Sequence, residues 1–448
     1  MSFLNAQSRI MVSIETLYEY YLAHPVICTD SRQIASGCLF FALKGEKFDG
    51  NQYAEKALTD GAAYAVVDDP SLANKQGILL VENALTALQH LARHHRRAIQ
   101  IPVIGIGGSN GKTTTKELIA AILSSHYPCH FTKGNFNNHI GVPLTLLAMP
   151  KDTEVAVIEM GANHPGEIDE LCQIAEPTHG LITNIGKEHL EGFGSLEGVK
   201  KAEGELFRYL ARSGGCAFVN ASEKYLTTMA RSNKRKLTYA ASDALHELQA
   251  TFVEVQLLRQ TPFVEVAFVG ENNKPIQLQS KLFGRHNFNN IMSAIALGMY
   301  FKVPALKIKA AIEAYIPTNN RSQIIEKDSN TIILDAYNAN PSSMEAALDS
   351  FAAMDAQHKV AILGDMLELG TESAKEHQAI LRRAQRLKLD TVVVVGKEFE
   401  AVHPTKYKAL YFPDAAAVKV WLNTQNFTHT MLLIKGSRGI RLETILLS

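Results

Sequence analysis

No run of 18 apolar residues occurs in the sequence, so no segment is long enough to cross a membrane as a hydrophobic helix. The first 25 residues carry polar and charged side chains throughout and lack the apolar stretch and cleavage site of a signal peptide. The five cysteines are scattered, odd in number and without metal-ligand spacing, which is typical of reduced structural thiols. We therefore expect a cytoplasmic protein without membrane insertion.

The chain also lacks an excess of either charge, since Lys and Arg together number 45 and so do Asp and Glu. The average field therefore favours neither nucleic acid nor an anionic membrane, and any anion-binding site must be local. With 448 residues, 46% of them apolar and 20% charged, the composition is that of a globular protein too long for one hydrophobic core. We expect about three domains.

The pattern of apolar and turn-forming residues changes near residues 100 and 318. Residues 1–100 alternate short apolar runs with turns, as in a small α/β domain. Residues 101–318 alternate apolar strands with helices, which indicates a parallel sheet, and the stretch near 251–283 is typical of antiparallel strands. Residues 319–448 form a third α/β unit. The clearest predicted strands are 101–105, 155–159, 181–185, 216–219, 331–334, 360–363, 391–395 and 431–434, and the predicted helices are 84–99, 113–123, 287–301, 342–354, 372–387 and 415–423.

A glycine-rich loop lies between a predicted strand and a predicted helix. Its glycines allow successive N–H groups to point at one phosphate, and the start of the helix adds free donors and a positive dipole. Lys112 can neutralise the β- and γ-phosphates, and the Thr113 hydroxyl can bind Mg²⁺. The strict Walker pattern requires glycine where this chain has Ile106, and the loop alone does not distinguish a ligase from a kinase or an ATPase. The loop consists of Gly108, Ser109, Asn110, Gly111, Lys112, Thr113 and Thr114.

The loop is similar to the nucleotide loop of the Mur ligases and the folylpolyglutamate synthases, although those enzymes usually have threonine where this chain has Gly107. Further segments keep the order of the family across almost the whole chain and resemble the Mur ligases that add D-alanyl-D-alanine. An N-terminal segment, Thr29–Arg32 with Asp49, resembles their UDP-sugar-binding domain. The other segments are Gly134–Asn138, Gly141–Pro143, Glu159–Ala162, Asn184–His189, Gly284–Asn287, Asp335–Pro341, Leu363–Gly370 and Lys435–Arg438.

The resemblance implies an α/β fold with the three-domain Mur ligase architecture. A central P-loop parallel-sheet domain at 101–318 would be flanked by an N-terminal UDP-substrate α/β domain at 1–100 and a C-terminal Rossmann-like α/β domain at 319–448. The resemblance also implies an ADP-forming acid–D-amino-acid ligase of peptidoglycan synthesis, and hence of cell wall formation, cell shape and cell division.

In the implied reaction, a carboxylate of UDP-N-acetylmuramoyl-tripeptide attacks the γ-phosphate of ATP. The amine of D-alanyl-D-alanine then displaces phosphate from the acyl phosphate through a tetrahedral intermediate. Both steps gather negative charge, which metal ions and fixed cations would stabilise. The implied partners are ATP, two Mg²⁺ ions and these two substrates, bound to a monomer. The third residue of the tripeptide stays open between lysine, diaminopimelate and another residue.

By the same resemblance, the catalytic and metal-binding residues follow strand ends. Glu159 would bind Mg²⁺ together with Thr113, and His189 would be a second ligand or an orienting group. Arg321 would reach the γ-phosphate, and Asp335 would bind the ribose hydroxyls. The adenine end of ATP is expected to contact His286, Asn287 and Asn290, and the UDP group is expected to contact Ser31, Arg32 and Asp49. The muramoyl-peptide is expected to lie along Asn137 and Asn138. The dipeptide is expected to contact residues among Asn338, Asn340 and Ser343.

One position departs from the family. Mur ligases commonly have a lysine that reacts with CO₂ to give a carbamate, which binds the second Mg²⁺, and the matching segment here places Glu203 there. We expect Glu203 to supply a ready-made carboxylate to the metal. In the alternative, Glu203 is solvated and Lys200 or Lys201 takes the role, although a shift of two or three positions turns a side chain well away on a helix.

Three other functions stay open from the sequence. The chain could be another Mur-type ligase or a folylpolyglutamate synthase, against which segments 335–341 and 364–370 argue. It could be a P-loop kinase or ATPase without ligase activity. It could also be a scaffold that binds nucleotide without catalysis, which the intact Lys112, Glu159 and His189 argue against.

Overall fold

The computed structural model describes residues 11–242 and 252–446. The chain forms two compact units that are interleaved along the sequence. The first comprises Met1–Gly105, Pro128–Gly161 and Asp169–Thr178, and the second comprises Ile106–Tyr127, Ala162–Ile168 and His179–Ser448. The prediction that no signal peptide is present concerns residues that lie partly outside the described ones. The domain boundaries near 100 and 318 stay predictions.

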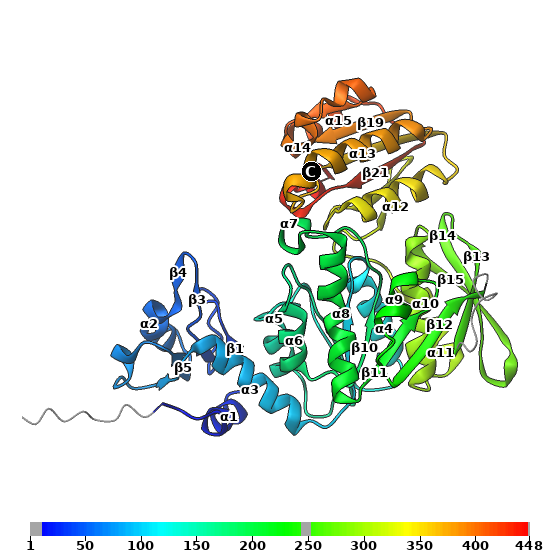
Figure 1. Ribbon diagram of the computed structural model, residues 1–448. Helices are drawn as coiled ribbons and strands as arrows, with labels where there is room; N and C mark the ends of the chain where they lie inside the picture. The colour runs from blue at the N-terminus through cyan, green and yellow to red at the C-terminus, as the bar shows by residue number, and fades with distance from the viewer. Residues whose placement is uncertain (1–10, 243–251, 447–448) are drawn as a thin grey trace, which may run out of the picture. The chain divides into compact units, whose positions relative to one another are not determined.

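The N-terminal part of the first unit is a small α/β layer (Figure 1). Its four-stranded sheet has the order β1-β2-β5-β6, and each neighbouring pair is parallel. Phe40, Ala65 and Val67 of the sheet share a buried apolar core with Ala54 and Ala57 of helix α2. The elements are α1 (Ile14–Ala23), β1 (Ile27–Cys28), β2 (Leu39–Phe41), β3 (Lys44–Gly45), β4 (Phe48–Asp49), α2 (Ala54–Thr59), β5 (Tyr64–Val67), β6 (Ile78–Leu80) and α3 (Ala84–Ala98).

Strand β7 (Val103–Gly107) contributes residues to both units. Within the first unit the strand order continues from β7 to β9 (Val155–Glu159) and β8 (Cys129–Phe131), and β8 and β9 are parallel. All five residues of β7 and of β9 are buried. This burial on both faces explains why both strands are almost wholly apolar in sequence. Helices α5 (Gly141–Leu147) and α6 (Glu167–Ala175) follow β8 and β9 along the chain.

Within the second unit the strand order is β15-β14-β13-β12-β11-β10-β7. Strands β10 to β13 pair in parallel, and β13, β14 and β15 form the antiparallel part. Helix α8 packs against β10 and β11, while α10 packs against α4 and β12. The elements are α4 (Lys112–Ser124), β10 (His179–Ile182), α7 (Leu190–Phe193), α8 (Leu196–Ser213), β11 (Cys216–Asn220), α9 (Lys224–Met229), β12 (Arg235–Ala241), β13 (Val253–Arg259), β14 (Phe263–Val269), β15 (Pro275–Phe283), α10 (His286–Tyr300) and α11 (Ala305–Ala314).

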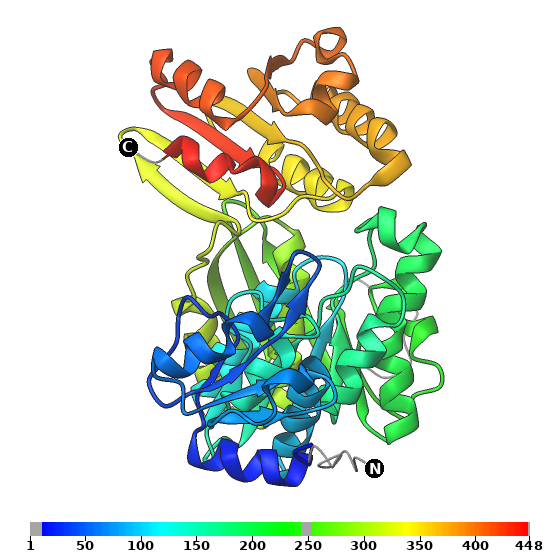
Figure 2. The same cartoon turned by 90° about the vertical axis from the view of Figure 1, so that its left-hand side faces the viewer.

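The C-terminal part of the second unit has its own six-stranded sheet in the order β16-β17-β21-β18-β19-β20. All neighbouring pairs are parallel except β16 with β17, whose hairpin is drawn in yellow in Figure 2. Ile332, Ile362, Val393 and Ile434 form its buried core with Val418 of α15. The elements are β16 (Gln323–Lys327), β17 (Asn330–Asp335), α12 (Pro341–Ala352), β18 (His358–Gly364), α13 (Ser373–Arg386), β19 (Thr391–Val395), α14 (Lys397–Ala401), β20 (Leu410–Phe412), α15 (Ala415–Thr424) and β21 (Thr430–Lys435).

The predicted strands and helices are present, most of them with ends within two residues of the predicted ones, and two strands are displaced along the chain. The strand predicted at 101–105 is β7 at 103–107, because Gly107 continues the strand and its carbonyl accepts the Thr183 N–H. The strand predicted at 181–185 ends at Ile182, because Thr183 and Asn184 instead bond to the glycine-rich loop. The antiparallel strands predicted near 251–283 are confirmed for β13 to β15, and residue 251 lies outside the described part.

None of the helices within residues 11–242 and 252–446 combines the length and the apolar character that crossing a bilayer requires.

A buried arginine holds the end of α3 in the first unit. Arg96 is 7% exposed, and its guanidinium donates to four backbone carbonyls at distances of 3.0–3.3 Å. The acceptors belong to Ala175, Glu176, Ile99 and Ile101. A planar group with five donors can satisfy several carbonyls at once, so one side chain joins α3, the approach to β7 and the end of α6.

Arg96→Met should therefore lower the free energy of unfolding by about 2–4 kcal/mol, because several buried carbonyls lose their donor. The neighbouring Arg97 is the matched control, since its side chain is 62% exposed and pairs with Glu176 at the surface. Arg97→Met should cost about 1 kcal/mol or less. Urea denaturation followed by circular dichroism compares the two, and equal losses would contradict the role given to Arg96.

Candidate functional site

The glycine-rich loop connects the end of β7 to the start of α4. Gly108 has φ +115° and Gly111 has φ +79°, a region that side-chain-bearing residues rarely adopt. Space is also limited, because a Cβ at Gly108 would collide with Thr183 and one at Gly111 would collide with Asn290. Lys112 is the first residue of α4, so the loop leads directly into a helix N-terminus.

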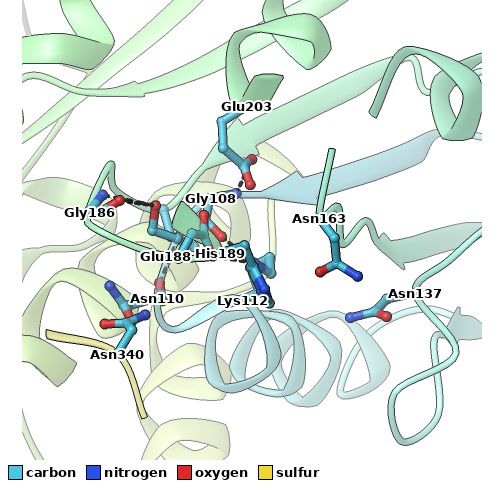
Figure 3. A network of polar contacts seen from close by, with 12 residues as sticks. Gly108, Asn110, Lys112, Asn137, Asn163, Gly186, Glu188, His189, Glu203 and Asn340 are labelled. Atoms are coloured by element: carbon cyan, nitrogen blue, oxygen red, sulfur yellow. Dashed lines mark hydrogen bonds and ion pairs between the residues drawn. The ribbon is translucent and has the colours of Figure 1, made fainter. Parts of the chain in front are cut away.

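The segment after β10 supports this loop (Figure 3). Asn184 accepts the Ser109 N–H through its carbonyl at 2.9 Å and the Asn110 N–H through Oδ1 at 3.1 Å. Thr183 Oγ1 donates to the Asn110 carbonyl at 2.7 Å, and Ser109 Oγ accepts the Gly186 N–H at 2.8 Å. Because side chains and backbone both hold it, the loop conformation is fixed by the protein itself.

Lys112 and the buried Glu188 form the charged centre of the second unit. The Lys112 ammonium donates to the Gly108 carbonyl at 2.5 Å and lies 3.4 Å from Glu188 Oε2. Glu188 is 3% exposed. The sequence pattern does not single out Glu188, and its only signal is its place in the segment Asn184–His189. Thr113 lies beside Lys112 on α4 and is also buried.

Glu203 on α8 reaches the same loop. It is fully buried, and its Oε2 accepts the Gly108 N–H at 2.5 Å. Burial raises the pKa of Glu203 to about 8, while Lys112 lowers that pKa and Glu188 raises it. The alternative in which Glu203 is solvated is therefore wrong. Lys201 is exposed, and the Lys200 ammonium pairs with Glu197 at 2.6 Å.

Glu159 ends β9 in the first unit. It is 2% exposed, its Oε1 accepts from Asn137 Nδ2 at 2.8 Å, and its N–H donates to Thr132 Oγ1. Asn138 does something different, because its Oδ1 accepts the N–H groups of Ile140 and Gly141 at the start of α5. Of the two asparagines predicted to line the peptide route, Asn137 supports the Glu159 carboxylate and Asn138 shapes a local turn.

His189 is the N-cap residue before α7 and has φ +41°, and its Nδ1 lies 2.5 Å from Glu368 Oε2. Hydrogen bonding to His189 lowers the pKa of Glu368. Glu368 lies in the Leu363–Gly370 segment that carried the family resemblance, but no role is predicted for Glu368 from the sequence. The structure thus supplies an orienting partner for His189.

Three predicted nucleotide-binding residues lie at the start of α10. Asn290 Oδ1 accepts from Thr115 Oγ1 of α4 at 3.1 Å, and Asn290 Nδ2 donates to Asn287 Oδ1 at 2.8 Å. Asn287 Nδ2 in turn donates to the Phe283 carbonyl. Burial lowers the pKa of His286 to about 4, so its imidazole is neutral near pH 7.

The predicted residues of the third domain are engaged in its own framework. Asp335 ends β17 and accepts from Lys435 Nζ at 2.6 Å and from the Ser322 N–H. Burial raises the pKa of Asp335, but the Lys435 ammonium, His286 and the Ser322 N–H together lower the pKa overall. The Arg321 guanidinium lies 3.6 Å from the centre of the Tyr337 ring. Lys435 Nζ also donates to the carbonyl of Asn338.

Asn340 and Ser343 form the capping box of α12, each side chain accepting the backbone N–H of the other. Asn340 Nδ2 also donates to Asn110 Oδ1 of the glycine-rich loop at 2.8 Å. Figure 3 shows these two asparagines side by side. Asn340, which is predicted to contact the dipeptide, therefore contacts the glycine-rich loop.

The predicted UDP-binding residues lie on turns of the first unit. Arg32 has an 85% exposed side chain and pairs with Asp30 at 2.7 Å. Ser31 is the neighbouring turn residue and is half-buried. Asp49 Oδ1 accepts the N–H of Asn51 at 2.9 Å.

Three family models match successive parts of the chain. The Mur ligase family catalytic domain matches residues 25–105, the Mur ligase middle domain residues 106–298, and the Mur ligase glutamate ligase domain residues 320–438. The UDP-N-acetylmuramoyl-tripeptide–D-alanyl-D-alanine ligase of Bacillus subtilis is 35% identical, with coverage of 96% of this chain and 93% of that one. The enzyme of the same name from Escherichia coli is 35% identical, with coverage of 94% and 92%.

This chain belongs to the Mur ligase family. A solved structure of MurF from Acinetobacter baumannii is 32% identical, covers 94% of this chain and 92% of that chain, and gives a TM-score of 0.83. MurF ligase from Thermotoga maritima in complex with ADP is 25% identical, covers 94% and 96%, and gives 0.81. The family resemblance and the three-domain α/β Mur ligase fold are confirmed. An unrelated P-loop kinase or ATPase is therefore the wrong interpretation.

The residues of this Mur ligase fit a divalent cation beside the loop. Glu188 Oε1 and Glu203 Oε1 are buried and have no hydrogen-bond partner within the described part of the chain. Carboxylate oxygens are ligands that Mg²⁺ prefers, and a cation would favour the ionised form of Glu203. No three His, Cys, Asp or Glu side chains among residues 11–242 and 252–446 form a complete metal site. Mg²⁺ typically completes its coordination with substrate phosphates and water.

Asn137→Asp should lower kcat/KM for ADP formation by about 10- to 100-fold, because it removes the donor to Glu159 and adds a second negative charge beside it. The exposed Gln173, whose amide donates to Asp169 on α6, provides a control. Gln173→Ala should leave the rate within about twofold. A steady-state assay of ADP release tests both variants, and an undiminished rate in Asn137→Asp would refute the supporting role.

Proposed function

We propose that this chain is an ATP-dependent, ADP-forming ligase that joins D-alanyl-D-alanine to UDP-N-acetylmuramoyl-tripeptide in peptidoglycan synthesis. The observation that carries the proposal is the match to enzymes of that name at 35% identity over more than nine tenths of the chain. The buried Glu188 and Glu203 beside Lys112 of the glycine-rich loop support the same conclusion. The product would be UDP-N-acetylmuramoyl-pentapeptide, made in the cytoplasm by a monomer.

The phosphate loop would bind ATP through its backbone N–H groups and the N-terminus of α4. Lys112, fixed between the Gly108 carbonyl and Glu188, would meet the β- and γ-phosphates, and Arg321 would add a second cation at the γ-phosphate. His286, Asn287 and Asn290 would contact the adenine end, and Asp335 the ribose. Such fixed cations need no rearrangement when charge develops in the transition state.

Two Mg²⁺ ions held by Thr113, Glu159, His189 and Glu203, with Glu188 as a further carboxylate, would neutralise phosphate charge in both steps. Asn137 would keep the Glu159 carboxylate oriented, and Glu368 would do the same for His189. These contacts use the protein's own residues to fix groups that must not move when the tripeptide carboxylate attacks the γ-phosphate.

The proposed domains divide the substrates between them. Residues 1–100, with Ser31, Arg32 and Asp49, would bind the UDP group, and residues 101–318 would bind ATP and the reacting carboxylate. Residues 319–448 would supply Arg321 and Asp335 and present Asn338, Asn340 and Ser343 to the dipeptide. Exclusion of water would protect the acyl phosphate from hydrolysis until the amine attacks.

An assay with a matrix of UDP-muramoyl-peptides and amine substrates tests the proposed reaction. ADP release should depend on both a UDP-muramoyl-tripeptide and D-alanyl-D-alanine, and mass spectrometry should find the pentapeptide product. Tripeptides ending in lysine and in diaminopimelate are both included, which identifies the preferred third residue. ADP release without any amine, or ligation of glutamate or diaminopimelate instead of the dipeptide, would refute the proposal.

If Glu203 supplies the metal-binding carboxylate directly, removal of bicarbonate should not change the rate of the unmodified protein. Glu203→Gln keeps an acceptor for the Gly108 N–H but loses the charge, so kcat should fall about 10- to 100-fold. Lys201→Gln, at an exposed position of the same helix, should have little effect. A strong requirement for added CO₂ together with a nearly silent Glu203→Gln would overturn the assignment.

A further inference from the structure

Gly107 precedes the phosphate loop, and its backbone does not explain why it is glycine. It is the last residue of the buried strand β7, and its φ lies outside the left-handed region that favours glycine. An L-residue could therefore adopt this conformation. The reason for the missing side chain must be sought in what surrounds it.

The atom nearest to the place of a side chain at Gly107 is a carboxyl oxygen of Glu203. A Cβ at Gly107 would lie 2.7 Å from Glu203 Oε2, whereas the next side-chain atom outside Glu203, Leu206 Cδ2, would be at an ordinary 3.7 Å. Carbon atoms essentially never approach a carboxylate oxygen as closely as 2.7 Å without something moving. A single carboxylate therefore excludes a side chain at this position.

Glu203 cannot move aside without a loss. Its carboxyl group is fully buried and accepts the Gly108 N–H at 2.5 Å, so the hydrogen bond joins two groups that water does not reach. Gly108 is also confined on its other side, where a Cβ would collide with Thr183. Displacing the carboxylate would leave both it and the Gly108 N–H buried without this bond.

The same residue connects Glu203 to the functional lysine. The N–H of Gly108 is held by Glu203, and the carbonyl of Gly108 accepts from Lys112 Nζ at 2.5 Å. The position of Lys112 thus depends on Gly108, and the position of Gly108 depends on Glu203. Glu203 in turn needs the space that Gly107 leaves free. Figure 3 shows Glu203 pointing at Gly108 with Lys112 beside it.

We propose that Gly107 is a positioning residue: the absence of a side chain at 107 and the carboxylate at 203 form one interdependent unit that sets the first turn of the phosphate loop and, through it, Lys112. This inference rests on the proposed function, in which Lys112 contacts the β- and γ-phosphates of ATP. It also makes Gly107 and Glu203 a matched pair, so that neither can be exchanged independently of the other.

A double-mutant cycle with the full chain tests the dependence. The variants are Gly107→Ala, Glu203→Ala and both together, and the probe is ADP with Mg²⁺, measured by isothermal titration calorimetry. Gly107→Ala alone should weaken ADP binding at least about tenfold, the usual size of a lost hydrogen bond to a charged group. In the Glu203→Ala background, where no carboxylate is present, Gly107→Ala should change the affinity less than about twofold.

A second pair keeps the test decisive if Glu203→Ala fails to fold. Glu203→Asp withdraws the carboxylate by one methylene, so Gly107→Ala should lower the melting temperature less in that background than in the unmodified protein. Gly204→Ala on the same helix is the control, because a Cβ there meets only the ends of the Arg208 and Met229 side chains. It should leave ADP binding and kcat within about twofold.

Steady-state kinetics separates positioning from general instability. Gly107→Ala should lower kcat per folded molecule as well as raise the KM for ATP, and the combined variant with Glu203→Asp should recover part of kcat. Equal losses of ADP affinity with and without the carboxylate, or a silent Gly107→Ala, would overturn the inference. If no variant ligates any amine but the coupling in ADP binding persists, the proposed function fails and the inference stands.

Discussion

Two buried carboxylates, one ammonium group and one backbone N–H meet at the phosphate loop, and the site depends on their balance. Burying an ionised carboxylate is costly unless a charge or donor compensates it. Glu188 has Lys112, and Glu203 has the Gly108 N–H. One oxygen of each carboxyl group, Oε1 of Glu188 and Oε1 of Glu203, has no hydrogen-bond partner within the described residues, so the protein compensates these two groups only in part.

The parallel arrangement of the strands explains how residues distant in sequence reach such a site. In parallel sheets, ligand-binding residues follow the carboxyl ends of the strands. In the second unit, the loop after β7 and the 183–186 segment after β10 both occupy such positions. Neutral groups of Thr183 and Asn184 bond to Asn110 of the loop, while the Glu203 carboxyl group and the Lys112 ammonium bond to Gly108. The sheet supplies the location, and these side chains supply the orientation.

The sequence predicted the parts of the fold that depend on regular apolar patterns. The apolar run Thr-Val-Val-Val-Val predicts the buried strand β19. Strand β16 has the sequence Gln-Ile-Ile-Glu-Lys, which contains no such run, because β16 lies at a sheet edge and is partly exposed. The loop and Glu203 followed from local sequence and family pattern. Glu188 and Glu368 did not, because their roles come from contacts with residues 76 and 179 positions away, namely Lys112 and His189. Local sequence patterns do not predict contacts between residues so far apart in the chain.

The four carbonyls around Arg96 bear on how the chain folds as it is synthesised. Two of them follow within five residues, but the other two belong to Ala175 and Glu176, about 80 residues later. Until residues 175 and 176 have left the ribosome, two of the four acceptors are missing, and water must solvate the corresponding N–H groups of the guanidinium. The end of α3 therefore gains its last two acceptors only after much of the next segment has emerged, and a fragment ending at residue 100 would lack three of the four, the carbonyls of Ile101, Ala175 and Glu176.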